Sequence, residues 1–187
     1  MPRRLAKDAP IIMTIGHSTR TIEAFVEMLA AHGVRLVIDI RSIPRSRHNP
    51  QFNKDALPAS LKAARIGYRH MPALGGLRHA RPDSPNTAWR NASFRGFADY
   101  MLTEECATAL EKVIGLAKKK RAALLCAEAV PWRCHRSLVA DALEVKGVRV
   151  LHLTSRTGSR PHRRTYGGSV IRNPRRNKGL RICAESD

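Results

Sequence analysis

The chain has 187 residues, 43% of them hydrophobic, which suits one globular domain with a substantial core plus an extension. No apolar run approaches the ~20 residues of a membrane-spanning helix, and the basic N-terminus lacks the apolar stretch of a secretory signal, so we expect a cytoplasmic protein without membrane contact. Four cysteines are too few for a disulfide framework, which leaves free thiols, metal ligands or nucleophiles.

The net charge of +19 favours nucleic acid or another polyanion as a partner. The alternative is that the charge serves solubility alone or reflects an Arg-rich proteome. Residues 156–187 hold nine Lys or Arg and two acidic residues, which gives +7 and leaves +12 for the rest of the chain. We predict a single α/β domain over residues 1–155 and a basic, flexible tail over residues 156–187 that binds polyanions.

The chain begins with the pattern of a strand, a helix and a second strand. Residues 10–16 predict a buried strand, and the spacing of apolar residues after Thr21 predicts a helix that ends at Gly33. Residues 34–40 form another apolar run. This order predicts a parallel sheet, because parallel strands need a crossover connection.

The remaining pattern continues the alternation after a polar loop at residues 42–52. An irregular stretch from Leu74 to about Ser93 is long enough to indicate a functional or mobile loop. The other predicted elements are helices at about 56–66, 94–101, 104–119 and 134–146, and strands at about 68–72, 121–126 and 148–153.

Ionisable and nucleophilic residues gather where predicted strands end and the next helices begin. They are His17 and Ser18, Asp39 and Arg41, Cys126 and Glu128, and Cys134, His135 and Arg136. These points share one edge of a parallel sheet, where ligands bind. We therefore predict one cleft around His17, Asp39, Arg41, Cys126, Glu128 and Arg136. A structure with any two of these functional groups on opposite faces of the sheet would contradict the prediction of a single cleft.

Cys134 lies where a helix is predicted to begin, and the partial positive charge there favours a thiolate. With Arg133 and Arg136 nearby, we expect Cys134 to be more reactive than Cys126, which ends a buried strand beside Glu128. The alternative is that Cys134 only begins the helix, with its two following residues facing solvent.

The other two segments also have a structural alternative. Asp39 and Arg41 lie on the same side of a strand end, where they either form an ion pair that fixes the loop or contact a ligand directly. His17 and Ser18 either cap the next helix or touch a ligand, and Gly16 allows close approach of the backbone.

A metal is a further alternative. Cys126, Cys134, His135 and His17 offer soft ligands, but the spacing of eight between the cysteines is not that of a zinc ribbon. The chain has no Cys-x-x-Cys pair. We therefore predict no cofactor and no metal as the first interpretation.

Five segments resemble, in order, the motifs of the domain of unknown function 488 family. They are TIGHSTRTIEAFVEML, LVIDIRSIPRSRHNPQF, IGYRHMPALGG, FRGFADYM and LLCAEAVPWRCHRSLVADAL, within about Thr14 to Leu153. The resemblance implies a three-layer α/β fold with a mainly parallel sheet flanked by helices, and a pocket lined by the motif residues. It bears on fold and site far more than on function.

A weaker similarity is to rhodanese-like and cysteine phosphatase domains, which also have an Asp-x-Arg strand end and a Cys between a strand and a helix. Their anion loop closes with an Arg nearer to the Cys. Here nine residues separate Cys126 from Arg136, which argues against direct transfer of sulfur or phosphoryl groups through Cys126.

Our first hypothesis is an enzyme or sensor that acts on a phosphate-bearing ligand, either a nucleotide or nucleic acid. Its site would combine anion-binding arginines with a thiol nucleophile and a base. Arg41 and Arg136 would hold the anion beside Ser18 and Asp39, Cys134 or Cys126 would attack, His17 or His135 would act as base, and Glu128 would orient or donate a proton. The alternatives are a non-catalytic nucleic-acid-binding module and a metal-holding protein that uses the Cys and His residues.

Overall fold

The computed structural model describes residues 9–164, 170–172 and 180–182. Its helices are α1 (Ile22–Ala31), α2 (Leu57–Ala63), α3 (Ala92–Tyr100), α4 (Glu104–Lys119) and α5 (Arg136–Val145). Its strands are β1 (Ile11–Gly16), β2 (Leu36–Asp39), β3 (Gly67–His70), β4 (Ala122–Cys126), β5 (Arg149–Leu153), β6 (Ser159–Pro161), β7 (Val170–Arg172) and β8 (Leu180–Ile182). Short 3-10 helices are η1 (Pro50–Phe52), η2 (Pro72–Leu74) and η3 (Pro131–Arg133).

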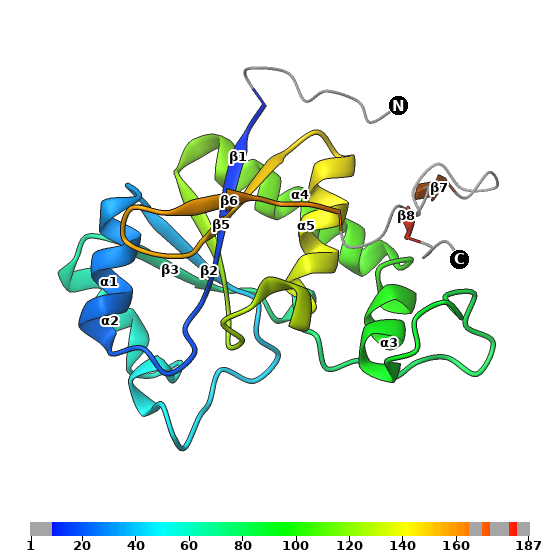
Figure 1. The fold of residues 1–187 in the computed structure, drawn as a ribbon, viewed down its shortest axis with the longest axis horizontal. Coiled ribbons are helices and arrows are strands. Elements are labelled where there is room, and N and C mark those ends of the chain that lie inside the picture. Colours follow the sequence, from blue (N-terminus) through cyan, green and yellow to red (C-terminus); the bar gives the residue numbers. More distant parts are fainter. Residues whose placement is uncertain (1–8, 165–169, 173–179, 183–187) are drawn as a thin grey trace.

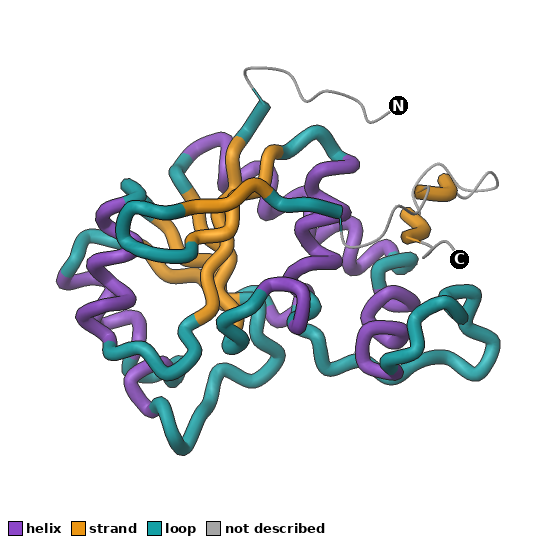
Figure 2. Tube along the Cα trace, viewed as in Figure 1, coloured by secondary structure: helices purple, strands orange, loops and turns teal. Residues whose placement is uncertain are grey.

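The first six strands form one sheet in the order β3-β2-β4-β1-β5-β6, and β7 pairs with β8 separately. All neighbours in the large sheet are parallel except β5 and β6, which are antiparallel. The mainly parallel sheet predicted from the sequence is confirmed, and Figure 2 shows its strands gathered at the centre of the molecule.

Helices cover both faces of the sheet and make three layers (Figure 1). One core packs the sheet against α3, α4 and α5, and a second packs it against α1 and α2. Successive side chains of β4 alternate between them: Leu124 and Cys126 belong to the first core and Leu125 to the second. The predicted three-layer α/β fold is confirmed.

The order of the strands places a topological switch point between β1 and β4. The chain leaves β1 through α1 on one face of the sheet, and it leaves β4 through α5 on the other face. Neighbouring strands whose connections run in opposite directions define the switch point at which open α/β sheets bind ligands. The residues that follow β1 and β4 therefore lie where a site is expected.

The long stretch between η2 and α3 is fixed to the fold by one buried carboxylate. Asp99 of α3 accepts hydrogen bonds from the backbone N–H of Arg81 (2.9 Å), the hydroxyl of Ser84 (2.6 Å) and the amide of Asn86 (2.8 Å). A buried carboxylate with several donors holds its loop in one arrangement. This loop therefore has a structural anchor in α3.

The sheet continues past residue 155, into the segment that the sequence predicts as a tail. Strand β6 pairs with β5, and His162 after it is buried. The tail residues Arg175 and Arg176, like Cys183, lie outside the described residues. Within the described part of the chain, no helix has the length and apolar character needed to cross a bilayer.

Candidate functional site

Two thiols and an imidazole meet at the carboxyl end of β4. The Cys134 thiol donates to the sulfur of Cys126 over 3.0 Å. Nδ1 of His135 lies 3.9 Å from Sγ of Cys126 and 3.7 Å from Sγ of Cys134. The cysteines are only 5% and 4% exposed, respectively. We call Cys126, Cys134 and His135 the thiol cluster.

The ring of His135 is held with one nitrogen toward both sulfurs. Its Nε2 lies 3.0 Å from the carbonyl oxygen of Leu74, and its edge packs on Phe97 at a centroid distance of 5.0 Å. A carbonyl oxygen only accepts, so Nε2 carries a proton, and Nδ1 faces both sulfurs, where it can take up the proton that Cys126 releases and then donate to the thiolate. Gly76 makes room for this ring, because a Cβ there would lie 2.4 Å from Nδ1.

The thiol cluster pulls the two cysteine pKa values apart. The pKa of Cys126 is well below its ordinary value, because the hydrogen bond from Cys134 stabilises its thiolate and outweighs burial, with help from His135 and Arg136. The pKa of Cys134 is raised, first by its hydrogen bond to Cys126 and then by burial. Cys126 is therefore the thiolate and Cys134 the donor.

The contacts favour Cys126 as the thiolate, whereas the sequence predicts Cys134 to be the more reactive thiol. Helix α5 begins at Arg136, two residues later than predicted, and Cys134 lies before it in an extended conformation, directly after η3. Its sulfur faces the core, where desolvation disfavours a charge. A short-range hydrogen bond between the thiols then decides which one ionises, and sequence position relative to a helix does not reveal that contact.

Arg136 is buried, at 2% exposure, rather than facing solvent. Its guanidinium donates to the carbonyl oxygens of Glu128 and Ala129, each over 2.7 Å. Gly16 lets this loop approach β1, because a Cβ there would collide with the Glu128 carbonyl and the Arg136 guanidinium. Arg136 thus fixes the loop after β4 and adds positive charge beside Cys126.

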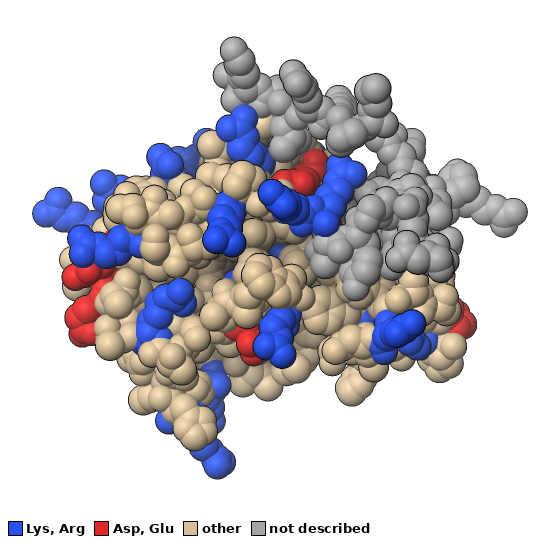
Figure 3. All heavy atoms as spheres, in the orientation of Figure 1, with Lys and Arg blue, Asp and Glu red and all other residues tan. Residues whose placement is uncertain are grey.

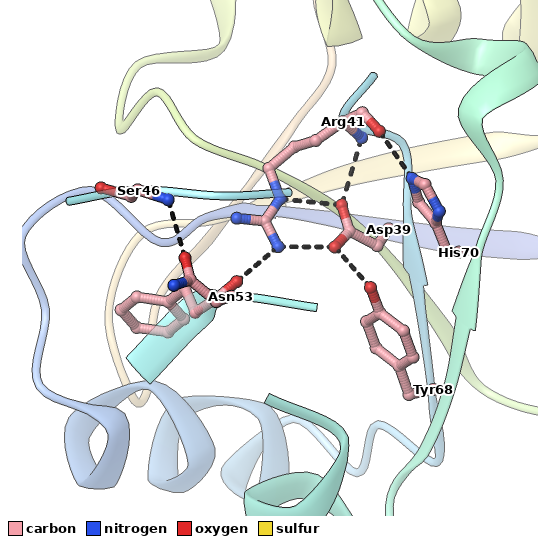
Figure 4. A network of polar contacts seen from close by, with 7 residues as sticks. Asp39, Arg41, Ser46, Asn53, Tyr68 and His70 are labelled. Atoms are coloured by element: carbon pink, nitrogen blue, oxygen red, sulfur yellow. Dashed lines mark hydrogen bonds and ion pairs between the residues drawn. The ribbon is translucent and has the colours of Figure 1, made fainter. Parts of the chain in front are cut away.

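Asp39 and Arg41 form a buried ion pair on the other side of the sheet (Figure 4). Arg41 donates from Nε to one carboxylate oxygen (2.9 Å) and from a terminal nitrogen to the other (2.6 Å), and also to the carbonyl of Phe52 (2.8 Å). Tyr68 donates to the same carboxylate (2.8 Å), and burial beside Asp39 raises the pKa of its phenol. The ion-pair interpretation of Asp39 and Arg41 thus fits the contacts.

Sequence reasoning missed Tyr68 and His70, which complete this network from β3. His70 Nε2 lies 2.8 Å from the carbonyl oxygen of Arg41 (Figure 4). The signal was present in the segment IGYRH, because alternate residues of a strand share a face. What the sequence does not show is that β3 lies directly beside β2.

His17 and Ser18 follow β1 but do not cap α1, whose first turn is capped by Thr21. The His17 ring stacks on Phe52 at a centroid distance of 4.5 Å, and its Nδ1 lies 2.8 Å from the Ser18 carbonyl oxygen. Burial, the largest cause, lowers the pKa of His17, and Arg41 lowers it further. His17 is therefore neutral at pH 7. Ser18 adopts a left-handed backbone, with φ of 50°.

A polar cleft of about 320 Å³ opens between the loops that follow β1, β2 and β4. Its ionisable lining residues are His17, Arg41, Arg45 and Glu128. We call it the edge cleft. Residues from three separate loops line it, and they include residues, such as Ser18, that the sequence predicts to lie in one site.

The single cleft predicted from the sequence is nevertheless divided in two. Cys126 packs in the core beside α4 and α5, whereas Asp39 and Arg41 lie with Phe52 and Tyr68 on the face of α1 and α2. Side chains alternate along a strand, so residues at one edge of a sheet can still point to opposite faces. The thiol cluster and the edge cleft are neighbours, with the loop after β4 between them.

A family model described as Domain of unknown function DUF488 matches residues 21–143. The chain belongs to the DUF488 family. The matched range contains the whole thiol cluster and the Asp39–Arg41 pair, whereas His17 and Ser18 precede it. No curated protein and no solved structure matches the chain. The similarity to rhodanese-like domains stays a prediction.

Two kinds of chemistry are open to the thiol cluster of this DUF488 chain. A thiolate beside a proton-accepting imidazole is the arrangement of a cysteine nucleophile. The ligand atoms of Cys126, Cys134 and His135 lie within 4.8 Å of one another. Among the described residues, they form the one group of His, Cys, Asp or Glu side chains that could hold a metal ion. A histidine whose second nitrogen is held by a backbone carbonyl is also typical of metal ligation.

Proposed function

We propose that the protein is a cysteine-dependent enzyme or sensor that acts on a phosphate-bearing ligand at the carboxyl edge of its sheet. The observation that carries this proposal is the thiol cluster, in which one buried sulfur receives a hydrogen bond from a second and faces an imidazole nitrogen. Free cysteines in cores are otherwise inert, with raised pKa values. Cys106 is such a case, because burial raises its pKa to about 12.

Each member of the cluster has a distinct role in this proposal. Cys126 is the nucleophile or sensing thiolate. Cys134 donates the hydrogen bond that keeps it ionised, and His135 accepts or returns a proton at Nδ1. Arg136 supplies positive charge from its buried position and supports the loop after β4.

The edge cleft is the proposed place for the phosphate. Arg45 brings positive charge to its wall, which also holds the carboxylate of Glu128, while the charge of Arg41 in the same wall is balanced by Asp39. Ser18 lines the same space. The wider surface is also basic: Figure 3 shows Lys and Arg over much of one face and few acidic side chains. Such a field attracts anions.

Site-resolved alkylation tests both halves of the proposal. Iodoacetamide should modify Cys126 at pH 6.5 nearly as fast as at pH 8.5, because it is already a thiolate, while Cys106 should stay unmodified. Pyrophosphate bound in the edge cleft should slow this reaction by placing negative charge near the thiolate. Arg45→Gln should weaken the effect of pyrophosphate without changing the rate in its absence.

Two results would contradict the proposal. Alkylation of Cys126 that rises tenfold per pH unit through neutral pH would show an ordinary thiol. Rates that are unchanged by pyrophosphate, in the wild type as in Arg45→Gln, would remove the phosphate from the edge cleft and leave only the thiol chemistry.

A second candidate, a thiolate-bound metal, is favoured by the spacing of the three ligand atoms within 4.8 Å. Zn²⁺ takes Cys and His ligands and keeps a fourth position open in catalytic sites. Purification without chelators followed by elemental analysis would give one zinc per chain. Co²⁺ substitution would give a sulfur-to-cobalt absorption band that disappears in Cys134→Ala. A metal-free protein with a reactive Cys126 would favour the first candidate.

A further inference from the structure

Trp132 is exposed although tryptophan is the largest apolar side chain. It lies in η3, between β4 and α5, and is 64% exposed. The other tryptophan of the chain, Trp89, is only 5% exposed and stacks on Phe94 within the core. Single exposed apolar side chains are common on protein surfaces, so what matters for Trp132 is what surrounds its ring.

Trp132 lines a cavity of about 780 Å³ on the α5 side of the edge cleft. Three arginines share its wall: Arg20 after β1, Arg160 in β6 and Arg163 after β6. No acidic side chain among the described residues lines it. Ala129 belongs to this cavity and to the edge cleft, so the two hollows adjoin along the loop after β4.

A buried hydrogen-bonded chain fixes the floor of this cavity. The chain runs from the Thr14 hydroxyl to His152 Nδ1 (2.7 Å), from His152 Nε2 to His162 Nδ1 (2.9 Å), and from His162 Nε2 to Asp141 (2.7 Å). It ties β6 to β5 and α5, so that Arg160 and Arg163 are carried on a strand of the sheet and its continuation. The cavity wall is therefore pre-formed, which lowers the entropic cost of binding.

We propose that this cavity binds single-stranded nucleic acid, with an unpaired base stacked on Trp132 and the adjoining phosphates on Arg20, Arg160 and Arg163. Stacking on an aromatic ring inside a basic groove is how proteins hold single strands without reading sequence. A duplex keeps its bases stacked on one another and offers no free ring face to the indole. The net charge of +19 adds long-range attraction for a polyanion. No cysteine takes part, so this surface is independent of the thiol cluster.

Tryptophan emission tests the proposal directly, because Trp132 is exposed and Trp89 is buried. A 12-nucleotide poly(dT) oligomer should quench the exposed component of the emission as it binds the full chain. The same quenching should be absent in Trp132→Phe, in which only Trp89 emits. The affinity for a labelled oligomer, measured by anisotropy, should fall about 5- to 150-fold in Trp132→Ala, which corresponds to ~1–3 kcal/mol for one stacked base. Trp132→Phe should retain most of the affinity.

Charge variants separate this cavity from general basicity. Arg160→Gln should weaken the oligomer and reduce the dependence of log affinity on log salt by about 0.7, which is the loss of one single-strand phosphate contact. Lys119→Gln removes the same charge at the exposed last turn of α4 and should leave the slope unchanged. Cys126→Ser should bind as the wild type does, so failure here and failure of the proposed thiol function are separate results.

Three outcomes would overturn the proposal. One is binding of the oligomer without quenching, and another is equal affinity in Trp132→Ala and the wild type. The third is equal quenching by a duplex or by thymidine monophosphate at the same nucleotide concentration, which would assign the cavity to another class of ligand.

Discussion

The thiol of Cys134 lies 3.0 Å from the sulfur of Cys126 and donates a hydrogen bond to it. The two cysteines come from different segments: Cys126 ends β4, and Cys134 directly follows η3. Because a thiolate accepts a hydrogen bond better than a thiol does, this contact makes ionisation of one sulfur depend on the proton of the other. The pair is therefore a unit, and changing either residue changes the chemistry of both.

The first prediction follows from that coupling. Cys134→Ala should raise the pKa of Cys126, because its largest stabilising contact is lost while burial remains. The pH midpoint of Cys126 alkylation, followed by mass spectrometry, should move upward. Cys134→Ser, whose hydroxyl still donates, should lie between this variant and the wild type. A midpoint that is the same in all three proteins would show that the sulfurs do not interact.

A second prediction concerns Gly76, the last residue of the Leu74-Gly75-Gly76 segment, which makes room for the His135 ring. A Cβ at Gly76 would lie 2.4 Å from Nδ1 of His135, so Gly76→Ala should displace the ring and raise the pKa of Cys126 by weakening its contact with the imidazole. Gly115→Ala in α4 is the matched control, since nothing lies within 4 Å of its added methyl group. That change should stabilise the helix by about 0.5–1 kcal/mol and leave alkylation of Cys126 unaltered.

The sequence predicts the sheet and its edge well because both depend on local rules. Apolar runs and strand ends place Cys126, Asp39 and His17 at one edge without any knowledge of strand order. Which face each side chain takes depends on the alternation within each strand and on the neighbours it acquires. That is why the sequence brings Cys126 and Arg41 into one cleft, whereas the fold separates them.

The end of the domain shows a second limit to what the sequence predicts. After Thr154 the apolar periodicity ends, which predicts a tail. Strand β6 holds instead through backbone pairing with β5 and through His162, whose buried partners are His152 and Asp141. A polar hydrogen-bonded chain of this kind leaves no hydrophobic pattern. A truncation after Thr154 would therefore remove part of the sheet and cannot serve as a test of tail residues alone.

A third prediction compares two Asp–Arg pairs of this chain. Asp39→Asn leaves the buried Arg41 guanidinium without its counter-charge and should lower the free energy of unfolding by about 3–5 kcal/mol. Asp83→Asn breaks the pair with Arg81, which is exposed, and should cause little or no change. Urea unfolding at pH 7 measures both. Equal effects of the two substitutions would mean that burial of the first pair does not hold in solution.

The last prediction concerns the pH dependence of stability through His152. Burial, aided by the nearby His162 and Arg136, lowers the pKa of His152 to about 3. The unfolded chain binds a proton at this residue below about pH 6.5, whereas the folded chain does not until about pH 3. Between these values the unfolded state holds more protons, so the contribution of His152 to stability is lost as pH falls. One proton corresponds to ~1.4 kcal/mol per pH unit.

His152→Gln has no proton to gain, so its free energy of unfolding should fall less steeply between pH 6 and pH 4 than that of the wild type. The variant is less stable at pH 7.5 because it loses the contacts to Thr14 and His162, and the gap between the two proteins should narrow on acidification. Carboxylates titrate in both proteins and cancel in the comparison. His48→Gln, at an exposed histidine, should keep the wild-type slope. A constant gap between wild type and His152→Gln from pH 7.5 to pH 4 would show that His152 is protonated equally in the folded and unfolded states.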